Sequence, residues 1–429
     1  MTSSLLRRVS LLSLPTAALA IAACLTCTGP AGTGPAVTGF AAVGSTAPPT
    51  GVRMSLPAPT GPYPVGTTSL RLTDRGRHDP WVTSRPYREL MVSVRYPARD
   101  VAGHPPAPQM LRGEAAGFDA LNGLTDIPKG RVDWAATLSH AHTQAPIARR
   151  GPRGFPVVLY SPGAADPRSL GTTLCDDLAS RGFVVVMIDH TFDAAAVEFP
   201  GGRVEKSVLP QEFDKATKAG QEQVTALLKK TMSVRVADTR LVLDQLGRLP
   251  GQLRGALDLG SVGMFGQSAG GFTAAQTMHD DTRLKAAADL DGVLGYTQRD
   301  DDPANPSSVG TDGVDRPLLL MGKEGDNHHT VASWGAAWRH SDGRLQDLTL
   351  TGAEHASFTD LQSEIPQLAG PLGLSGRSVA ATIGTVEPAR SVAAQEAYVT
   401  AFFDRWLRGG DGHLLDGPSG RYPEMRFVR

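Results

Sequence analysis

A serine set between glycines is the strongest chemical signal in the sequence. Ser268 lies in the segment GQSAG (residues 266–270), after an apolar run at 262–265 that has the pattern of a strand and before a helical pattern at 270–275. A serine on a sharp strand-to-helix turn is a nucleophile elbow, and its glycines let the neighbouring strand and helix approach closely. The pattern predicts a serine nucleophile. The alternative is a glycine-rich turn with an incidental serine.

A serine hydroxyl needs a general base, and His355 is placed for that role. It follows directly after the last predicted strand, residues 346–351, in the segment GAEHASF (352–358). In folds that carry a nucleophile elbow, the base is a histidine on the loop after the final strand. Most other histidines lie away from this position. His190 follows another predicted strand and is the exception that could lie near the site.

Two aspartates could orient His355. The acid must lie between Ser268 and His355 in chain order, at the carboxyl end of a strand. Asp291 closes a predicted strand at 285–291, and Asp326 follows a predicted strand at 317–322. The position used by most proteins with this elbow favours Asp326, but chain order admits both.

Strands and helices alternate along the chain from about residue 67, and they must hold these side chains. The predicted strands are residues 89–96, 156–161, 183–189, 261–265, 285–291, 317–322 and 346–351, and the predicted helices are 170–181, 234–246 and 394–407. Such alternation implies a mostly parallel central sheet with helices on both faces. Together with the elbow it predicts an α/β-hydrolase fold. The long stretch 97–154, rich in proline and glycine, is typical of a lid or a binding loop.

Composition limits the classes of partner. The 429 residues are 41% hydrophobic and 20% charged, which is enough to bury a large core, and the net charge of −1 provides no field for nucleic acid. Residues 324–329 and 300–302 hold acidic side chains and histidines without a recognisable metal-ligand spacing. We therefore expect no metal, no cofactor and no nucleic-acid partner.

The first residues have the pattern of a targeting segment. Arg7 and Arg8 precede a short apolar run, so residues 1–27 are predicted to be a signal peptide. Cys24 ends a sequence that resembles a bacterial lipobox, which would tether the protein to a membrane, although ordinary cleavage explains the pattern equally well. We expect an exported protein, either secreted or lipid-anchored at the cell surface.

Composition also divides the rest of the chain. Residues 28–62 are rich in Gly, Pro, Ala and Thr and predict a flexible linker. Residues 63–429 are predicted to form one catalytic domain. Only Cys175 lies inside that domain, so no disulfide framework is expected there, and nothing in the sequence indicates an oligomeric state.

Five segments in order resemble the plasma-type platelet-activating factor acetylhydrolases and their bacterial relatives. These segments are VLYSPG (158–163), DHTFDA (189–194), GQSAGG (266–271), LDG (290–292) and HASFTD (355–360), and the resemblance runs from about residue 60 to 408. It implies a serine esterase that acts on short-acyl or oxidised-acyl phospholipids. It also assigns the catalytic acid to Asp291, with Asp326 in reserve.

Two backbone N–H groups are needed to hold the oxyanion of the tetrahedral intermediate. They map to Ala269, after the nucleophile, and to Ala164, in the loop after a central strand. The resembled family carries a bulky residue at 164 and an aromatic residue near 293, where this chain has Ala164 and Val293. The small side chains suggest a roomier site. A general lipase or polyesterase, an acyltransferase, and a catalytically silent binding protein are the alternatives.

Overall fold

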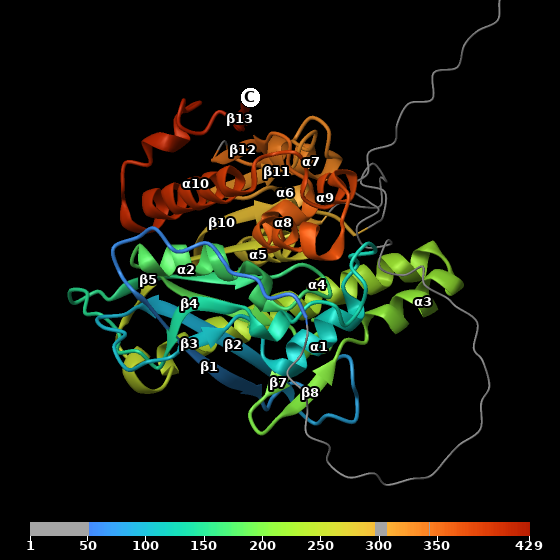
Figure 1. Ribbon diagram of the computed structural model, residues 1–429. Helices are drawn as coiled ribbons and strands as arrows, with labels where there is room; N and C mark the ends of the chain where they lie inside the picture. Colours follow the sequence, from blue (N-terminus) through green and yellow to red (C-terminus); the bar gives the residue numbers. More distant parts are fainter. Residues whose placement is uncertain (1–50, 297–306, 343) are drawn as a thin grey trace, which may run out of the picture.

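The computed structural model describes residues 51–296, 307–342 and 344–429, and Figure 1 shows how their elements are arranged. The strands are β1 (Val65–Asp74), β2 (Arg88–Pro97), β3 (Pro106–Pro108), β4 (Leu138–Thr143), β5 (Phe155–Ser161), β6 (Val184–Asp189), β7 (Ala196–Phe199), β8 (Arg203–Lys206), β9 (Leu257–Gln267), β10 (Leu284–Leu290), β11 (Leu318–Gly322), β12 (Leu345–Leu350) and β13 (Met425–Val428). The α-helices are α1 (Arg112–Leu121), α2 (Thr172–Ser180), α3 (Leu209–Ala219), α4 (Gln221–Gln245), α5 (Ala269–Asp280), α6 (Ser308–Asp312), α7 (Ala332–His340), α8 (Leu361–Leu372), α9 (Gly376–Ile383) and α10 (Pro388–Arg408).

Eleven of these strands form one sheet in the order β13-β12-β11-β10-β9-β5-β6-β2-β1-β4-β3, while β7 and β8 pair separately. The six strands from β12 to β6 in this order run parallel to one another. The flanking strands β13 and β2 are antiparallel to their neighbours β12 and β6. This arrangement confirms the predicted mostly parallel sheet, and it places the carboxyl ends of the central strands at one edge.

The sheet is buried on both faces, and β5 shows how the sequence achieves this. Val157 and Leu159 pack with residues of α4, α5 and α7, whereas Val158 and Tyr160 pack with residues of α2 and α10. Alternate side chains of a strand point to opposite faces, so a continuous apolar run supplies two cores at once. Helices α2 and α10 contact each other over one face (Figure 1). The predicted cover of helices on both faces is therefore confirmed.

Each of the seven predicted strands is present, as β2, β5, β6, β9, β10, β11 and β12, with ends shifted by a few residues. Helix α4 begins well before the predicted residue 234, because its first half packs on α3 instead of the sheet. Val224 and Leu227 are buried against Phe213 of α3. Because the apolar residues in the first half of α4 face α3, they do not continue the pattern of the residues that face the sheet.

The folded chain begins earlier than the linker prediction allows. Within residues 51–62, Met54 and Leu56 are buried, and Thr60 donates from its N–H and its hydroxyl to Asp177 Oδ1 at 2.8 and 2.7 Å. The linker prediction is therefore wrong for these residues. The linker prediction rested on composition alone, and composition does not show the partners that order this segment, because they come from distant parts of the chain.

Residues 1–50 lie outside the described part, and with them the predicted signal peptide, Cys24 and the rest of the predicted linker. The same holds for residues 300–302. Among the described residues, the helices include none with the length and apolar character required to cross a membrane.

Candidate active site

Ser268 lies on a strained turn between β9 and α5. Its backbone has φ 55° and ψ −125°, a conformation that residues with side chains rarely adopt. Its N–H donates to the carbonyl oxygen of Leu290 at 2.9 Å, which ties the turn to β10. Ser268 is partly exposed at the carboxyl edge of the sheet. The strand, turn and helix expected of a nucleophile elbow are all in place.

The two glycines of the motif are required by close packing. A Cβ atom on Gly266 would overlap the backbone of Gly270, at the start of α5. A Cβ atom on Gly270 would overlap the carbonyl oxygen of Ser161 in β5. The elbow therefore fits between its own helix and the neighbouring strand only without side chains at these positions.

Asp291 and His355 meet beside the elbow. His355 follows β12 and begins the short helix η7 (His355–Phe358), and its Nδ1 lies 2.5 Å from Asp291 Oδ2. The other carboxylate oxygen of Asp291 accepts the N–H of Lys323 at 2.9 Å. Asp291 also has a positive φ of 59°, so its backbone shares the strain of the nucleophile.

The reserve acid Asp326 follows β11 but does not bond to His355 in the described structure. Its carboxyl is partly buried near Asp291, and burial, together with the charge of Asp291, raises its pKa to about 6. Lys323 and His355 oppose this rise. The geometry therefore pairs His355 with Asp291.

The second ring nitrogen of His355 faces the elbow. Its Nε2 lies 3.0 Å from Nε2 of Gln267, the residue before the nucleophile. Since the Asp291 carboxylate can only accept, the proton of a neutral ring lies on Nδ1 of His355 towards Asp291, and Nε2 of His355 is left as the acceptor. This is the tautomer that a general base needs. No hydrogen bond joins Ser268 to His355 in the described residues.

The surroundings of His355 favour its charged form. Burial lowers the pKa of the imidazole, but the hydrogen bond and charge of Asp291 and the charge of Asp166 outweigh it, so the pKa is raised above its usual value. Asp166 itself has a pKa raised to about 6, mainly by burial. Negative groups around the ring stabilise the imidazolium that proton transfer would create.

The predicted oxyanion donors are the backbone N–H groups of Ala269 and Ala164. Ala269 is the first residue of α5, and Ala164 lies in the loop 162–165 after β5, which we call the oxyanion loop. Neither N–H has a protein acceptor among the described residues, and both residues are partly exposed. The next residue, Ala165, has a positive φ of 64°. Two free donors beside a strained serine are what an oxyanion hole requires.

A comparison with protein families places the chain among known proteins. The family model of platelet-activating factor acetylhydrolase, isoform II, matches residues 51–378. The chain belongs to this family. The resemblance inferred from the five sequence segments is therefore confirmed.

Similar proteins are esterases by name. A probable 1-alkyl-2-acetylglycerophosphocholine esterase from Arthroderma benhamiae is 29% identical over 87% of this chain and 93% of its own. The platelet-activating factor acetylhydrolase of Cavia porcellus is 24% identical over 84% of this chain and 83% of its own. The solved structure of a ferulic acid esterase from Streptomyces cinnamoneus is 34% identical, with a TM-score of 0.70 over 88% of this chain and 99% of its own. This acetylhydrolase-family chain is thus an esterase with an α/β-hydrolase fold.

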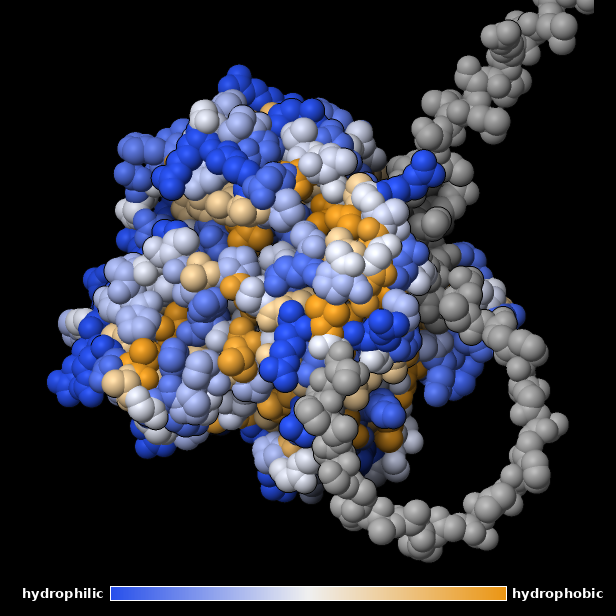
Figure 2. Space-filling model, viewed as in Figure 1, coloured by the Kyte–Doolittle hydropathy of each residue, from blue (hydrophilic) through white to orange (hydrophobic). Residues whose placement is uncertain are grey.

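A cavity of about 390 Å³ opens beside His355. One wall comes from the stretch 97–154, through Phe118 of α1 and the loop 122–127, and the other comes from α8 and α9. Figure 2 shows apolar surface over α8 and α9 on the same face as α1. The long stretch expected to be a lid or a binding loop therefore lines the pocket next to the base.

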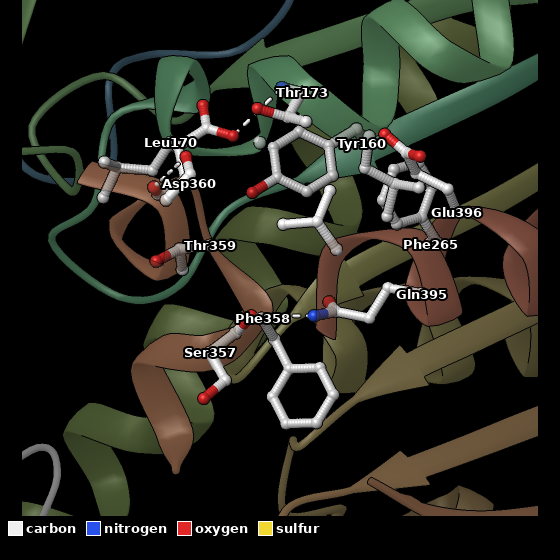
Figure 3. A pocket seen from close by; sticks show the side chains of 14 residues that line it. Tyr160, Leu170, Thr173, Phe265, Ser357, Phe358, Thr359, Asp360, Gln395 and Glu396 are labelled. Atoms are coloured by element: carbon white, nitrogen blue, oxygen red, sulfur yellow. Dashed lines mark hydrogen bonds between the residues drawn. The ribbon is translucent and has the colours of Figure 1, made fainter. Parts of the chain in front are cut away.

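The segment after His355 is anchored on its far side. Asp360 accepts the N–H groups of Thr172 and Thr173 at 2.9 and 3.0 Å, at the start of α2. Gln395 of α10 donates to the carbonyl oxygen of Ser357 at 2.8 Å. Figure 3 shows the contacts of Thr173 with Asp360 and of Gln395 with Ser357 around a small cavity of about 30 Å³ that residues 357–360 help to line. Two helices thus fix the loop that carries His355.

Among the residues considered for a metal, His328 has other partners. His328 bonds to Asp347, with its Nδ1 2.6 Å from Asp347 Oδ2, and its ring stacks on Trp338. The described residues include no cluster of three or more His, Cys, Asp or Glu side chains suited to a metal ion.

Several buried polar residues lie near the site, and the sequence analysis singled out only His190 among them. His190 is fully buried and bonds through Nε2 to Ser161 Oγ at 3.0 Å and through Nδ1 to Asp238 at 3.1 Å. Arg235 of α4 pairs with Asp193 after β6. Only the segment DHTFDA, which holds His190 and Asp193, gave a signal. Arg235 and Asp238 lie in a helix whose pattern is otherwise ordinary.

Proposed function

We propose that the chain hydrolyses short-acyl lipid esters through a triad of Ser268, His355 and Asp291. The observation that carries this proposal is the 2.5 Å contact between His355 Nδ1 and Asp291 Oδ2 beside the strained Ser268. An acyl-transfer site consists of a buried carboxylate, an imidazole and an accessible serine in this order.

The reaction follows from these positions. His355 takes the proton of Ser268 at Nε2 after Gln267 gives up its bond to that nitrogen, and the serine oxygen attacks the ester carbonyl carbon. The carbonyl oxygen becomes an oxyanion held by the N–H groups of Ala164 and Ala269. His355 then protonates the leaving alcohol. Water, deprotonated by His355, attacks the acyl-enzyme and releases the acid, while Asp291 stabilises the imidazolium.

Acetyl esters of glycerophospholipids are the proposed substrate class. Family membership and the name of the fungal relative, an esterase of 1-alkyl-2-acetylglycerophosphocholine, support this choice. The apolar pocket wall suits a lipid chain, and the small side chain of Ala164 adds room at the oxyanion loop. A second candidate is an ester of an aromatic acid, because the similar solved structure is a ferulic acid esterase.

Substrate comparison tests the proposal. We would measure kcat/KM for 1-alkyl-2-acetylglycerophosphocholine, for p-nitrophenyl esters of two to ten carbons, and for methyl ferulate. The proposal expects the acetyl phospholipid and short acyl chains to be preferred. A preference for methyl ferulate would favour the aromatic candidate, and acyl transfer to added alcohol in place of hydrolysis would favour an acyltransferase.

Covalent labelling separates an enzyme from a silent binding protein. A fluorophosphonate should label the wild-type chain and leave Ser268→Ala unlabelled. If the wild type neither reacted nor hydrolysed p-nitrophenyl acetate, the triad proposal would be wrong.

We also propose that the chain is exported, on the pattern of residues 1–27. Mass spectrometry of the mature N-terminus tests this. A lipid-modified Cys24 as first residue supports a membrane tether, and an unmodified cleavage product supports secretion. An uncleaved chain starting at Met1 contradicts export.

A further inference from the structure

A buried arginine from α4 donates hydrogen bonds to the backbone of the oxyanion loop. Arg235 donates from Nη1 to the carbonyl oxygen of Pro162 at 2.7 Å and from Nη2 to that of Gly163 at 2.9 Å. Asp193 accepts from Nε and from Nη2 at 2.7 Å each. The side chains of Arg235 and Asp193 are 0% and 1% exposed, so water does not compete for these bonds.

All donors of the Arg235 guanidinium have acceptors in this arrangement. A longer contact of 3.4 Å runs from Nη1 to Ser161 Oγ. With it, each of the five N–H groups of Arg235 has an acceptor. Asp193 Oδ1 also accepts the N–H of Ala165 at 3.1 Å. One ion pair therefore holds the carbonyls before Ala164 and the amide after it.

These contacts set the direction of the Ala164 N–H group. A trans peptide is planar, and its C=O and N–H bonds point in opposite directions. The peptide between Gly163 and Ala164 is trans. Because Arg235 draws the carbonyl oxygen of Gly163 towards α4, the N–H of Ala164 must point away from α4.

Apart from these contacts, the loop accepts two backbone hydrogen bonds, from Ala195 to the carbonyl oxygen of Ala165 at 2.9 Å and from Asp166 to that of Gly163 at 3.3 Å, and neither involves the Ala164 N–H group. Gly163 has no side chain, and Ala165 is held at a positive φ that alanine disfavours. An oxyanion donor contributes to catalysis only if it is already aimed before charge develops. A planar fork with five donors can hold two carbonyls and a carboxylate at once, whereas a lysine ammonium cannot.

We propose that Arg235 and Asp193 are positioning residues that aim the Ala164 N–H at the oxyanion of the tetrahedral intermediate. The inference rests on the proposed roles of Ser268 and Ala164. Neither side chain touches the substrate; both act through the loop backbone.

The test is the substitution Arg235→Lys, assayed with p-nitrophenyl acetate and normalised to active sites counted by complete fluorophosphonate labelling. Losing one oriented donor should lower kcat about 100-fold and change KM less than about threefold. Counting active sites removes molecules that fail to fold. Asp193→Asn is a milder second variant that keeps the side-chain volume, and its kcat should fall about tenfold.

A trifluoromethyl ketone gives a readout that a merely structural role would not change. Ser268 Oγ adds to its carbonyl carbon, the serine proton passes to His355, and the carbonyl oxygen becomes an oxyanion. The inhibition constant should rise about 100-fold in Arg235→Lys, in step with the loss of kcat.

Arg95→Lys is the matched control. Arg95 is equally buried and pairs with Asp176, with Nε 3.3 Å from Oδ1, but it does not contact the oxyanion loop. It should lose stability without losing kcat per active site. If Arg235→Lys and Asp193→Asn behave like Arg95→Lys in kcat and in ketone binding, the positioning role is wrong.

Ser268→Ala and Arg235→Lys together distinguish a failure of the positioning role from a failure of the proposed triad. Should Ser268→Ala keep wild-type activity, the proposed triad is wrong and the positioning role loses its basis. Should Ser268→Ala be inactive while Arg235→Lys keeps wild-type kcat, only the positioning role is contradicted.

Discussion

Two groups of serine, histidine and aspartate in this molecule share residue types and differ in almost everything else. The proposed catalytic set is Ser268, His355 and Asp291, and the buried set is Ser161, His190 and Asp238. Only the buried set is a complete hydrogen-bonded chain, from serine through both ring nitrogens to the carboxylate. A search by hydrogen bonds alone would choose the buried set.

Access and backbone conformation distinguish the two sets. The side chain of His355 is 31% exposed and opens on a cavity, whereas that of His190 is 0% exposed. Ser268 has a positive φ at a strand-to-helix turn, while Ser161 is the last residue of a regular strand. A substrate can reach Ser268 and His355 but not the buried set. Exposure and backbone strain therefore favour Ser268 as the nucleophile, although the buried set has the more complete hydrogen bonds.

The charges around the two histidines act in opposite directions. Burial lowers the pKa of His190 in spite of its bond to Asp238, and the nearby Arg235 lowers it further. In His355, the bond and charge of Asp291 outweigh burial and raise the pKa. One imidazole is held neutral as part of the framework. The other is prepared to accept a proton.

Removing the two serines should give the largest contrast. Ser268→Ala is expected to lower kcat roughly 10⁶-fold, because the nucleophile itself is lost. Ser161→Ala should keep kcat within about tenfold and instead cost about 1–3 kcal/mol of unfolding free energy, since His190 Nε2 loses its partner. Ester hydrolysis and urea denaturation measure the two effects. Equal losses of activity would break the comparison.

The choice of acid comes next in size. Asp291→Asn should lower kcat by about 10⁴-fold, because the amide no longer stabilises the imidazolium or selects its tautomer. Asp326→Asn, the matched control, should change kcat only a few-fold. Steady-state hydrolysis of p-nitrophenyl acetate decides between them. Near-wild-type activity in Asp291→Asn would reassign the acid.

The buried set should matter for stability. Arg88 and His190 both bond to Asp238, and Arg88 is completely buried. Asp238→Asn removes one of the two buried carboxylates that pair with Arg88 and leaves Asp79 as the other, so the unfolding free energy should fall by about 3–5 kcal/mol. Guanidinium chloride denaturation, with Asp326→Asn as reference, measures it. An unchanged midpoint would show that the ion pair is not needed for folding.

The pH dependence is the smallest predicted effect. His355 must be neutral to act as a base, so kcat/KM should rise with pH through a midpoint above about 6.5, the unperturbed histidine value. Asp291→Asn removes the charge that raises this pKa and should move the midpoint of its residual activity down. His190 should not contribute. A wild-type midpoint at or below the unperturbed value would contradict the raised pKa.

Much of the fold could be predicted because its signals are local. The strands of the central sheet are continuous apolar runs bounded by glycine, proline or polar residues, as in β5 and β6. The stretch 97–154 could not be resolved in this way. Its elements β3, α1 and β4 are short, and they take their order from distant partners: β4 pairs with β1 and contacts α2, and α1 packs on β7 and β8.

In the candidate site, too, local signals predicted some residues and left others open. Ser268 and His355 are marked by their positions after β9 and β12, since the carboxyl edge of a parallel sheet brings such residues together. Asp291 and Asp326 are equivalent by that rule. The family resemblance favoured Asp291, and in the structure it is Asp291 that lies within bonding distance of His355.

The sequence by itself determined the alternation of strands and helices, the elbow at Ser268 and the order of nucleophile, acid and base, because each depends on a short run of residues. The tertiary structure brings Asp291 to His355, as the family resemblance implied, and it alone decided how residues 97–154 form a pocket wall and that Arg235 of α4 reaches the carbonyls beside Ala164. These contacts join residues far apart in the chain. Their partners are selected by packing in three dimensions, for which a local pattern holds no signal.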